Sequence, residues 1–295
     1  MACMTVSTSD RLRPVPPALT RECDVVAALD RLESLATSGN LDQSSVLAAS
    51  GLLAMSIPAS FGGADISNLI VAEAVSRIAT WSTTVAERLL GHLVALEMIR
   101  TSGSTEQRKA IYARVVLGDV FELSSRREGA ALPRLVRSGL AFALEHGGSV
   151  LANSAVDWTI IGASSAGSEP MVAILDNKHL LVHDEDALSD LIVHPDYVLS
   201  LGEKADCLAR LMTAFLKAAY IRGHVNAQMR INPPEPTIAV EVELLDGMIQ
   251  KAASLIDVIQ VDDPAIDLEQ IDRYCRSLDT ARLRCSADHP PAIKS

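Results

Sequence analysis

The sequence predicts an α+β fold in which an N-terminal helical domain, a small middle β domain and a C-terminal antiparallel helical bundle follow one another. Three observations support this order. Apolar residues recur at steps of three and four before residue 118, short apolar runs alternate with turn residues over 119–200, and long helical spacing returns after 200. We therefore divide the chain into a loose leader (1–20), a helical domain (21–118), a β domain (119–200) and a helical bundle (201–295).

The expected helices are set by the spacing of their apolar residues. Val25, Leu29, Leu32 and Leu35 form one stripe, and Gly51 is placed to end a short second helix. The same spacing predicts another helix that begins at residue 68. It also predicts helices over 83–99, 105–117, 208–219, 238–259 and 268–278.

The middle of the chain carries the strand signals. Strand-length apolar runs occur at 140–144, 150–151, 158–161, 171–175, 179–182 and 191–193. Gly147 and Gly148 separate the first two runs, and a glycine pair suits the turn of a β-hairpin. We therefore expect a small sheet of short strands between the two helical regions.

The composition favours helices and excludes one class of partner. The chain is 48% hydrophobic but only 3% aromatic, so Leu, Ile, Val, Ala and Met must fill the core. Ala and Leu lose little side-chain freedom in a helix. The formal net charge is −11, and so acidic a surface repels phosphate backbones and anionic lipid, which argues against nucleic acid as the main partner. A small anionic ligand stays compatible because it needs only a local basic patch.

The cysteines and the N-terminus indicate a cytoplasmic protein. The five cysteines are scattered, without a CxxC pair or zinc-like Cys/His spacing, so we interpret them as reduced thiols and expect no metal site. The first residues lack the apolar segment of a secretory signal. The longest uncharged run, 43–64, contains Gly51, Pro58, Gly62 and Gly63, which makes it a poor membrane-spanning helix.

Six short motifs appear in an order that resembles the acyl-CoA dehydrogenase superfamily. Residues 51–64 (GLLAMSIPASFGGA) are similar to its GLL…IPxxyGGxG stretch, and residues 103–108 (GSTEQR) to its GTxEQK helix start. Residues 118–119 (GD) resemble the lead into its β domain. In the first motif Pro58 fixes φ, and the glycine pair that follows allows backbone angles that a Cβ forbids.

The other three motifs lie in the predicted β domain. Residues 121–127 (FELSSRR) resemble the ALSE strand that contacts flavin in the family. Residues 155–158 (AVDW) are similar to the hADW strand, and residues 193–199 (VHPDYVL) to the VPxExV exit strand. The resemblance runs from about residue 22 to 230 and is nearest to the branch of dibenzothiophene and sulfone flavin-dependent monooxygenases.

The resemblance implies a flavin-dependent oxidoreductase, either a dehydrogenase or a monooxygenase, with FAD or reduced FMN between the β domain and the C-terminal helices. Its substrate would be an acyl thioester or another small organic molecule, and family members associate through their C-terminal helices into homo- or hetero-oligomers. The cofactor-binding residues implied are Leu123, Ser124, Ser125, Arg126 and Trp158.

The implied catalytic residue is His92, which stands where the monooxygenase branch has a histidine near the substrate. Its pKa permits either proton state near neutrality. Each of these residues also has a structural interpretation. His92 is more simply a hydrogen-bonded histidine at a helix interface, Leu123 and Ser124 fit a plain strand, Arg126 fits a solvated turn and Trp158 fits the core.

The chain is shorter than the family pattern and departs from it near the flavin. Residues 151–154 run almost directly into 155–158, where the family has a longer flavin-facing strand, and Ser125 replaces the acid of ALSE. No Glu is assignable as a catalytic base. Two functions therefore stay open: an oxidoreductase impaired in flavin binding, and a non-catalytic paralogue that acts as a scaffold or hetero-oligomer partner of a full-length relative.

Overall fold

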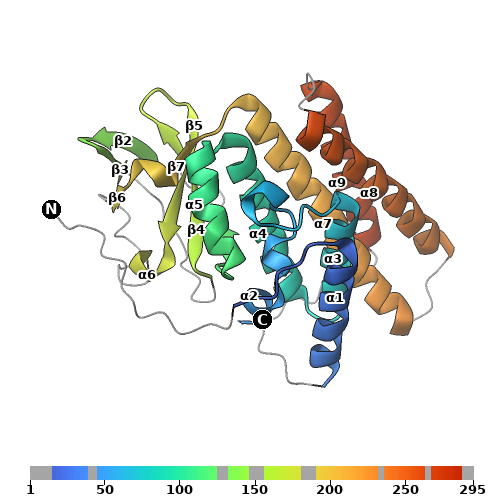
Figure 1. Cartoon of the computed structure of the whole chain (residues 1–295). Helices are drawn as coiled ribbons and strands as arrows, with labels where there is room; N and C mark the ends of the chain where they lie inside the picture. The colour runs from blue at the N-terminus through green and yellow to red at the C-terminus, as the bar shows by residue number, and fades with distance from the viewer. Residues whose placement is uncertain are drawn as a thin grey trace.

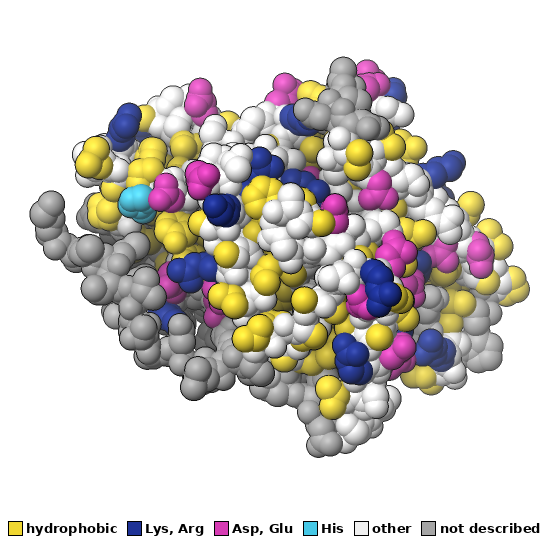
Figure 2. Space-filling model, in the orientation of Figure 1, with side chains coloured by type: hydrophobic (Ala, Val, Ile, Leu, Met, Phe, Trp, Pro, Cys, Tyr) yellow, Lys and Arg dark blue, Asp and Glu magenta, His cyan; other side chains and the backbone are white. Residues whose placement is uncertain are grey.

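The computed structural model describes residues 15–38, 45–124, 132–145, 156–180, 191–231, 236–262 and 267–287. Its elements follow the predicted order of helices, a small mixed sheet and long helices, so the α+β fold class is confirmed (Figure 1). On the face shown in Figure 2, basic and acidic side chains are interspersed over the helices.

The N-terminal helices begin and end at local signals. They are α1 (Glu22–Thr37), α2 (Val46–Ser50), α3 (Asn68–Ala79), α4 (Thr83–Ser102) and α5 (Thr105–Val116), with 3₁₀ turns η1 (Leu52–Ala54) and η2 (Ala59–Phe61). Gly51 ends α2 as predicted, in the left-handed conformation with φ of 81°. Ser104 and Gln107 form a capping box at the start of α5. The Gln107 amide also donates to the main-chain oxygen of Val198, which ties α5 to the sheet.

The strands form one sheet around β4. They are β1 (Phe121–Leu123), β2 (Arg134–Ser138), β3 (Ala141–Glu145), β4 (Trp158–Ser165), β5 (Pro170–Asp176), β6 (Leu191–Val193) and β7 (Val198–Ser200), with 3₁₀ turn η3 (Pro195–Tyr197) before β7. The spatial order is β6-β3-β2-β4-β5-β7, with β1 beside β4. One edge of β4 pairs with β5 in antiparallel, and its other edge pairs with β1 and β2 in parallel.

The two faces of the sheet belong to different cores. Phe121, Trp158 and Ile160 face the helices and join the main hydrophobic core. Ile161 and Ala163 alternate with them and belong to a second, smaller core within the β region. The face of β1 and β4 that bears Phe121 and Trp158 is therefore fixed against the helical part.

One predicted strand is wrong in the part that the structure describes. Residues 177–180 form a short helix, α6 (Asn177–Leu180), where the sequence predicted a strand over 179–182, and residues 181–182 lie outside the described residues. The Asn177 side chain turns the chain there, because its amide donates to Val156 O and its oxygen accepts from Thr159 Oγ1. The β2–β3 turn lies at Gly139, with φ of 62°.

Further predictions concern segments that the structure describes only in part or not at all. The predicted Gly147–Gly148 turn and the strand over 150–151 lie outside the described residues. The predicted loose leader is described from residue 15, and Leu19 within it is buried.

The C-terminal helices pack around α7. They are α7 (Glu203–Ile231), α8 (Pro236–Asp262) and α9 (Leu268–Ala287), and α7 contacts α3, α4, α8 and α9 (Figure 1). Gly223 allows α7 to approach α3 closely, because a Cβ there would lie 2.0 Å from Ser76 O. Next to it, the Arg222 guanidinium pairs with Glu73 on α3 at 2.7 Å and with Asp246 on α8 at 3.0 Å. Within the described part of the chain, no helix is both long enough and apolar enough to cross a bilayer.

A partly buried polar network also joins α8 to α3 and α4. The Asn68 amide donates to Asp257 Oδ1 at 2.6 Å and to Gln260 Oε1 at 2.9 Å. The Gln260 amide donates to Glu97 Oε2 at 2.7 Å, and burial raises the pKa of the Glu97 carboxyl. Because these bonds connect three helices and are partly screened from water, they help to fix the position of α8 against the N-terminal helices.

Candidate functional site

Strand β1 presents one main-chain edge to β4 and the other to the helices. The Ser124 N–H donates to Ile160 O on β4 at 2.9 Å. Main-chain groups alternate between the two edges of a strand, so the N–H and C=O of Phe121 and Leu123 point away from β4. The Phe121 N–H donates to His92 Nδ1 on α4 at 3.0 Å, which confirms this direction.

His92 is fully buried, and both of its ring nitrogens bind main-chain groups. Nδ1 accepts the Phe121 N–H, so the hydrogen of the neutral ring is on Nε2, which donates to Leu53 O at 3.1 Å. Burial lowers the pKa of His92 to about 4, so the ring is neutral at physiological pH. This histidine links η1, α4 and β1, and neither nitrogen is left to contact a substrate.

The next main-chain groups along this edge of β1 are the N–H and C=O of Leu123. The Leu123 N–H and C=O share the edge of Phe121, but no hydrogen bond to them occurs within the described residues. The Ser124 hydroxyl likewise has no hydrogen bond within that part of the chain, and both residues are half-buried. The end of β1 therefore offers one donor and one acceptor from the main chain, beside a hydroxyl that can do either.

Trp158 lies next to this edge but is enclosed. Phe121 and Tyr197 both stack on its ring, at centroid distances of 5.8 and 5.4 Å, and the Arg114 guanidinium lies over it at 4.8 Å. The indole N–H donates to Asp119 Oδ2 at 2.9 Å. Only 6% of Trp158 is exposed, so its ring has no surface left for a flavin. The structure places this residue in the core behind β1.

The remaining predicted flavin contacts, Ser125 and Arg126, lie outside the described residues. The structure thus brings His92, Leu123, Ser124 and Trp158 together around β1. Sequence reasoning missed the two groups that matter most there, the main-chain N–H and C=O of Leu123. No side-chain pattern reveals which edge of a strand lacks a partner.

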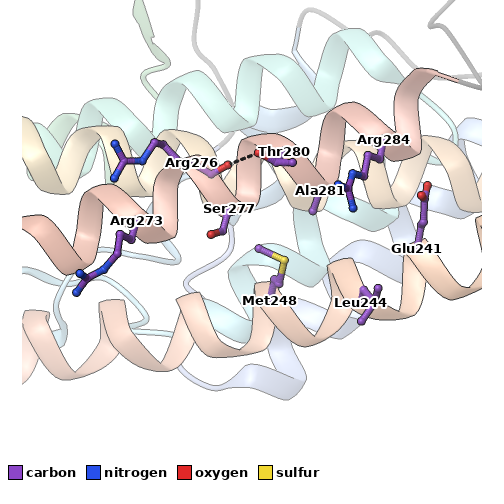
Figure 3. Close-up of a pocket in the computed structure, with 9 residues that line it drawn as sticks. All are labelled: Glu241, Leu244, Met248, Arg273, Arg276, Ser277, Thr280, Ala281 and Arg284. Atoms are coloured by element: carbon purple, nitrogen blue, oxygen red, sulfur yellow. Dashed lines mark hydrogen bonds between the residues drawn. The ribbon is translucent and has the colours of Figure 1, made fainter.

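The sheet edge is distinct from a groove on the C-terminal helices. This groove, of about 510 Å³, lies between α8 and α9 (Figure 3). Met248 and Leu244 of α8 line it opposite Ser277 and Ala281 of α9, and Arg284 lies near one end. None of its lining residues belongs to α4, β1 or β4, so it is not part of the predicted flavin site.

Residues 26–119 match the N-terminal domain of acyl-CoA dehydrogenases. The fold is also similar to that of FMN-bound TdsC from Paenibacillus sp. A11-2, a dibenzothiophene monooxygenase. That likeness has a TM-score of 0.74 at 12% identity and covers 90% of this chain and 85% of TdsC. A search of curated proteins by sequence found no match.

Two further solved structures share the fold. Methanesulfinate monooxygenase MsuC from Pseudomonas fluorescens has a TM-score of 0.65 at 15% identity, over 90% of this chain and 81% of MsuC. Butyryl-CoA dehydrogenase from Megasphaera elsdenii has a TM-score of 0.63 at 14% identity, over 90% of this chain and 86% of its own. Oxygenases and a dehydrogenase therefore have this architecture in common.

Proposed function

Because this chain has the acyl-CoA dehydrogenase fold, we propose that it is a flavin-dependent oxidoreductase of the monooxygenase branch. The observation that carries the proposal is the main-chain edge at Leu123, which lies between the sheet and the helices and has no hydrogen-bond partner among the described residues. Support for the branch comes from TdsC and MsuC, which are monooxygenases of the same fold. The cofactor is FMN or FAD, and the substrate is a small organic molecule.

The groups at the end of β1 fit the rim of a flavin ring. The rim carries both hydrogen-bond donors and acceptors, which match the C=O and N–H of Leu123 and the hydroxyl of Ser124. Trp158 does not fit as a stacking partner, because its ring is already covered. We assign it, with His92, to holding β1 in place.

A bound flavin supplies redox chemistry, either as hydride acceptor or, when reduced, by reaction with oxygen. The chain's own residues bind and orient it. Leu123 and Ser124 position the ring edge, while His92 stays neutral and holds the adjacent Phe121 N–H. A main-chain donor that is already in place orients a ligand without a cost in side-chain entropy.

Flavin titration of a Leu123→Pro variant tests the proposal. Proline removes the N–H that faces away from β4, and it leaves the ladder bonds of β1 intact. We expect the dissociation constant for FMN or FAD to rise about fivefold, because one hydrogen bond contributes about 1 kcal/mol. Quenching of flavin fluorescence measures it.

Leu123→Val keeps the N–H and serves as the matched control, with an expected affinity close to that of the wild type. The same melting temperature in both variants would show that proline has not disturbed the sheet. If the wild type binds neither FMN nor FAD, oxidised or reduced, the proposed function is wrong.

A second candidate is a non-catalytic scaffold that associates with a relative or with a second copy. The observation that favours it is an outer face of α8 that bears three exposed apolar residues, Val240, Leu244 and Val258, at 59%, 62% and 49% exposed. Their spacing of 4 and 18 residues places them on one side of the helix. The exposed Lys251 lies on the same face between Leu244 and Val258. A protein that ignores flavin yet associates through this face would support the scaffold.

A further inference from the structure

Helix α4 contains a glycine in its interior, at position 91. A glycine inside a helix is less favourable than alanine, so a helical glycine needs a reason. Among the described helices, Gly223 of α7 has a clear reason to be glycine, because a Cβ there would lie 2.0 Å from the main-chain oxygen of Ser76. Close approach of a neighbouring backbone does not account for Gly91.

Gly91 is half-buried, yet few atoms of the described residues lie near the position that its side chain would take. Among the described residues, a Cβ built on it would meet only Glu122 Cγ, at 4.0 Å, although the residue is half-buried. Gly247 of α8 also has no described atom within 4 Å, but it is exposed to solvent. Within the described part of the chain, the space beside Gly91 on α4 is therefore open, with Glu122 of β1 at its border. We call this open space the hollow.

The hollow adjoins the edge of β1 that faces the helices. The residue after Gly91 is His92, whose ring binds the Phe121 N–H. Two residues further along the same edge are the N–H and C=O of Leu123, which have no partner in the described part of the chain. Because a Cβ at position 91 would lie beside Glu122, the residue before Leu123, we expect a long side chain there to extend toward these groups.

We infer that Gly91 is a size-determining residue: it keeps open the hollow through which a flat aromatic heterocycle reaches the main-chain edge at Leu123. The inference rests on the proposed function for the identity of the ligand, a flavin. Alanine at position 91 leaves most of the space open. Leucine fills it, while stabilising the helix in the same way.

Three variants separate ligand access from helix stability: Gly91→Ala, Gly91→Leu and the control Gly247→Leu. All three should raise the melting temperature by roughly 2 °C, because each removes a helical glycine without a backbone clash. Only Gly91→Leu should weaken FMN binding, by about tenfold or more. Gly91→Ala should stay within about threefold of the wild type.

A second measurement needs no flavin. Hydrogen exchange of the Leu123 amide should be fast in the wild type and in Gly247→Leu, and roughly tenfold slower in Gly91→Leu, where leucine covers the N–H. If exchange at Leu123 is unchanged in Gly91→Leu, the inference is overturned, whether or not flavin binds. If exchange slows but the wild type binds no flavin, the hollow is established and only the proposed function fails.

Discussion

At the scale of single residues, the sequence leads to two predictions for His92, one functional and one structural. The sequence predicts either a catalytic residue near the substrate or an interface histidine. Its two nitrogens bind Leu53 O and the Phe121 N–H, so the ring supports β1 from behind. A pattern of side chains could not show this, because both partners are main-chain groups from distant parts of the sequence.

We expect His92 to make the stability of the protein depend on pH. Its pKa in the unfolded chain is 6.5, whereas burial lowers it to about 4 in the folded protein. The folded state therefore resists protonation, and this stabilisation is complete above pH 6.5 and lost as the pH falls through 4. The free energy of unfolding should decrease by about 3 kcal/mol across that window. Urea unfolding at a series of pH values measures it.

The control variant is His92→Phe, which keeps a flat ring but cannot titrate. It leaves Leu53 O and the Phe121 N–H without partners, so its unfolding free energy should be lower by about 2–4 kcal/mol at neutral pH. Its dependence on pH between about 6.5 and 4 should be weaker than that of the wild type. Equal slopes for the two proteins would exclude His92 as the titrating group.

At the scale of elements, the helices were predictable because each buries a regular apolar stripe. The expected helix over 238–259 is α8, and Gly51 ends α2 as its position suggested. The strand predicted over 179–182 is wrong at its described residues, 179–180, for an equally physical reason. The Asn177 side chain binds Val156 and Thr159 and turns the chain into a helix, a tertiary effect that local apolar spacing does not contain.

The crossing of α3 and α7 should be sensitive to a single methyl group. In Gly223→Ala the new Cβ would lie 2.0 Å from Ser76 O, a main-chain atom that cannot rotate away. The two helices must separate, so we expect the unfolding free energy to fall by about 1–3 kcal/mol. Gly247→Ala, whose new Cβ meets no atom of the described residues, should raise it by about 0.5–1 kcal/mol. Urea unfolding of both variants checks the pair, and stabilisation of both would contradict the close approach.

At the scale of the whole molecule, the order of the helical and β regions could be predicted from the sequence. The main-chain groups that form the candidate site could not. Helical and strand periodicities occupy separate stretches of the chain, so the α+β class was readable. The candidate site depends instead on which main-chain groups of β1 lack partners once α4 and β4 have packed against it. That property arises only from tertiary structure.

The outer face of α8 leads to a prediction about the assembly of the molecule. Val240 and Leu244 are mostly exposed, and Leu244 also lines the groove toward α9. Exposed apolar residues on one side of a long helix mark an interaction surface when they are contiguous. We therefore expect the protein to self-associate through α8, with each copy contributing the same residues to a two-fold interface.

Leu244→Lys should weaken this association, because it places a charge in the apolar face of both copies at once. Burial of each leucine contributes about 2 kcal/mol to the free energy of association. Loss of the two leucines in one interface should therefore raise the dissociation constant by roughly a hundredfold or more. Light scattering coupled to size exclusion measures the mass over a dilution series. Gln250→Lys is the matched control, since it adds the same charge at an exposed position on another side of α8. A wild-type protein that stays monomeric at high concentration, or a Leu244→Lys variant that dissociates no more readily than Gln250→Lys, would contradict self-association through this face.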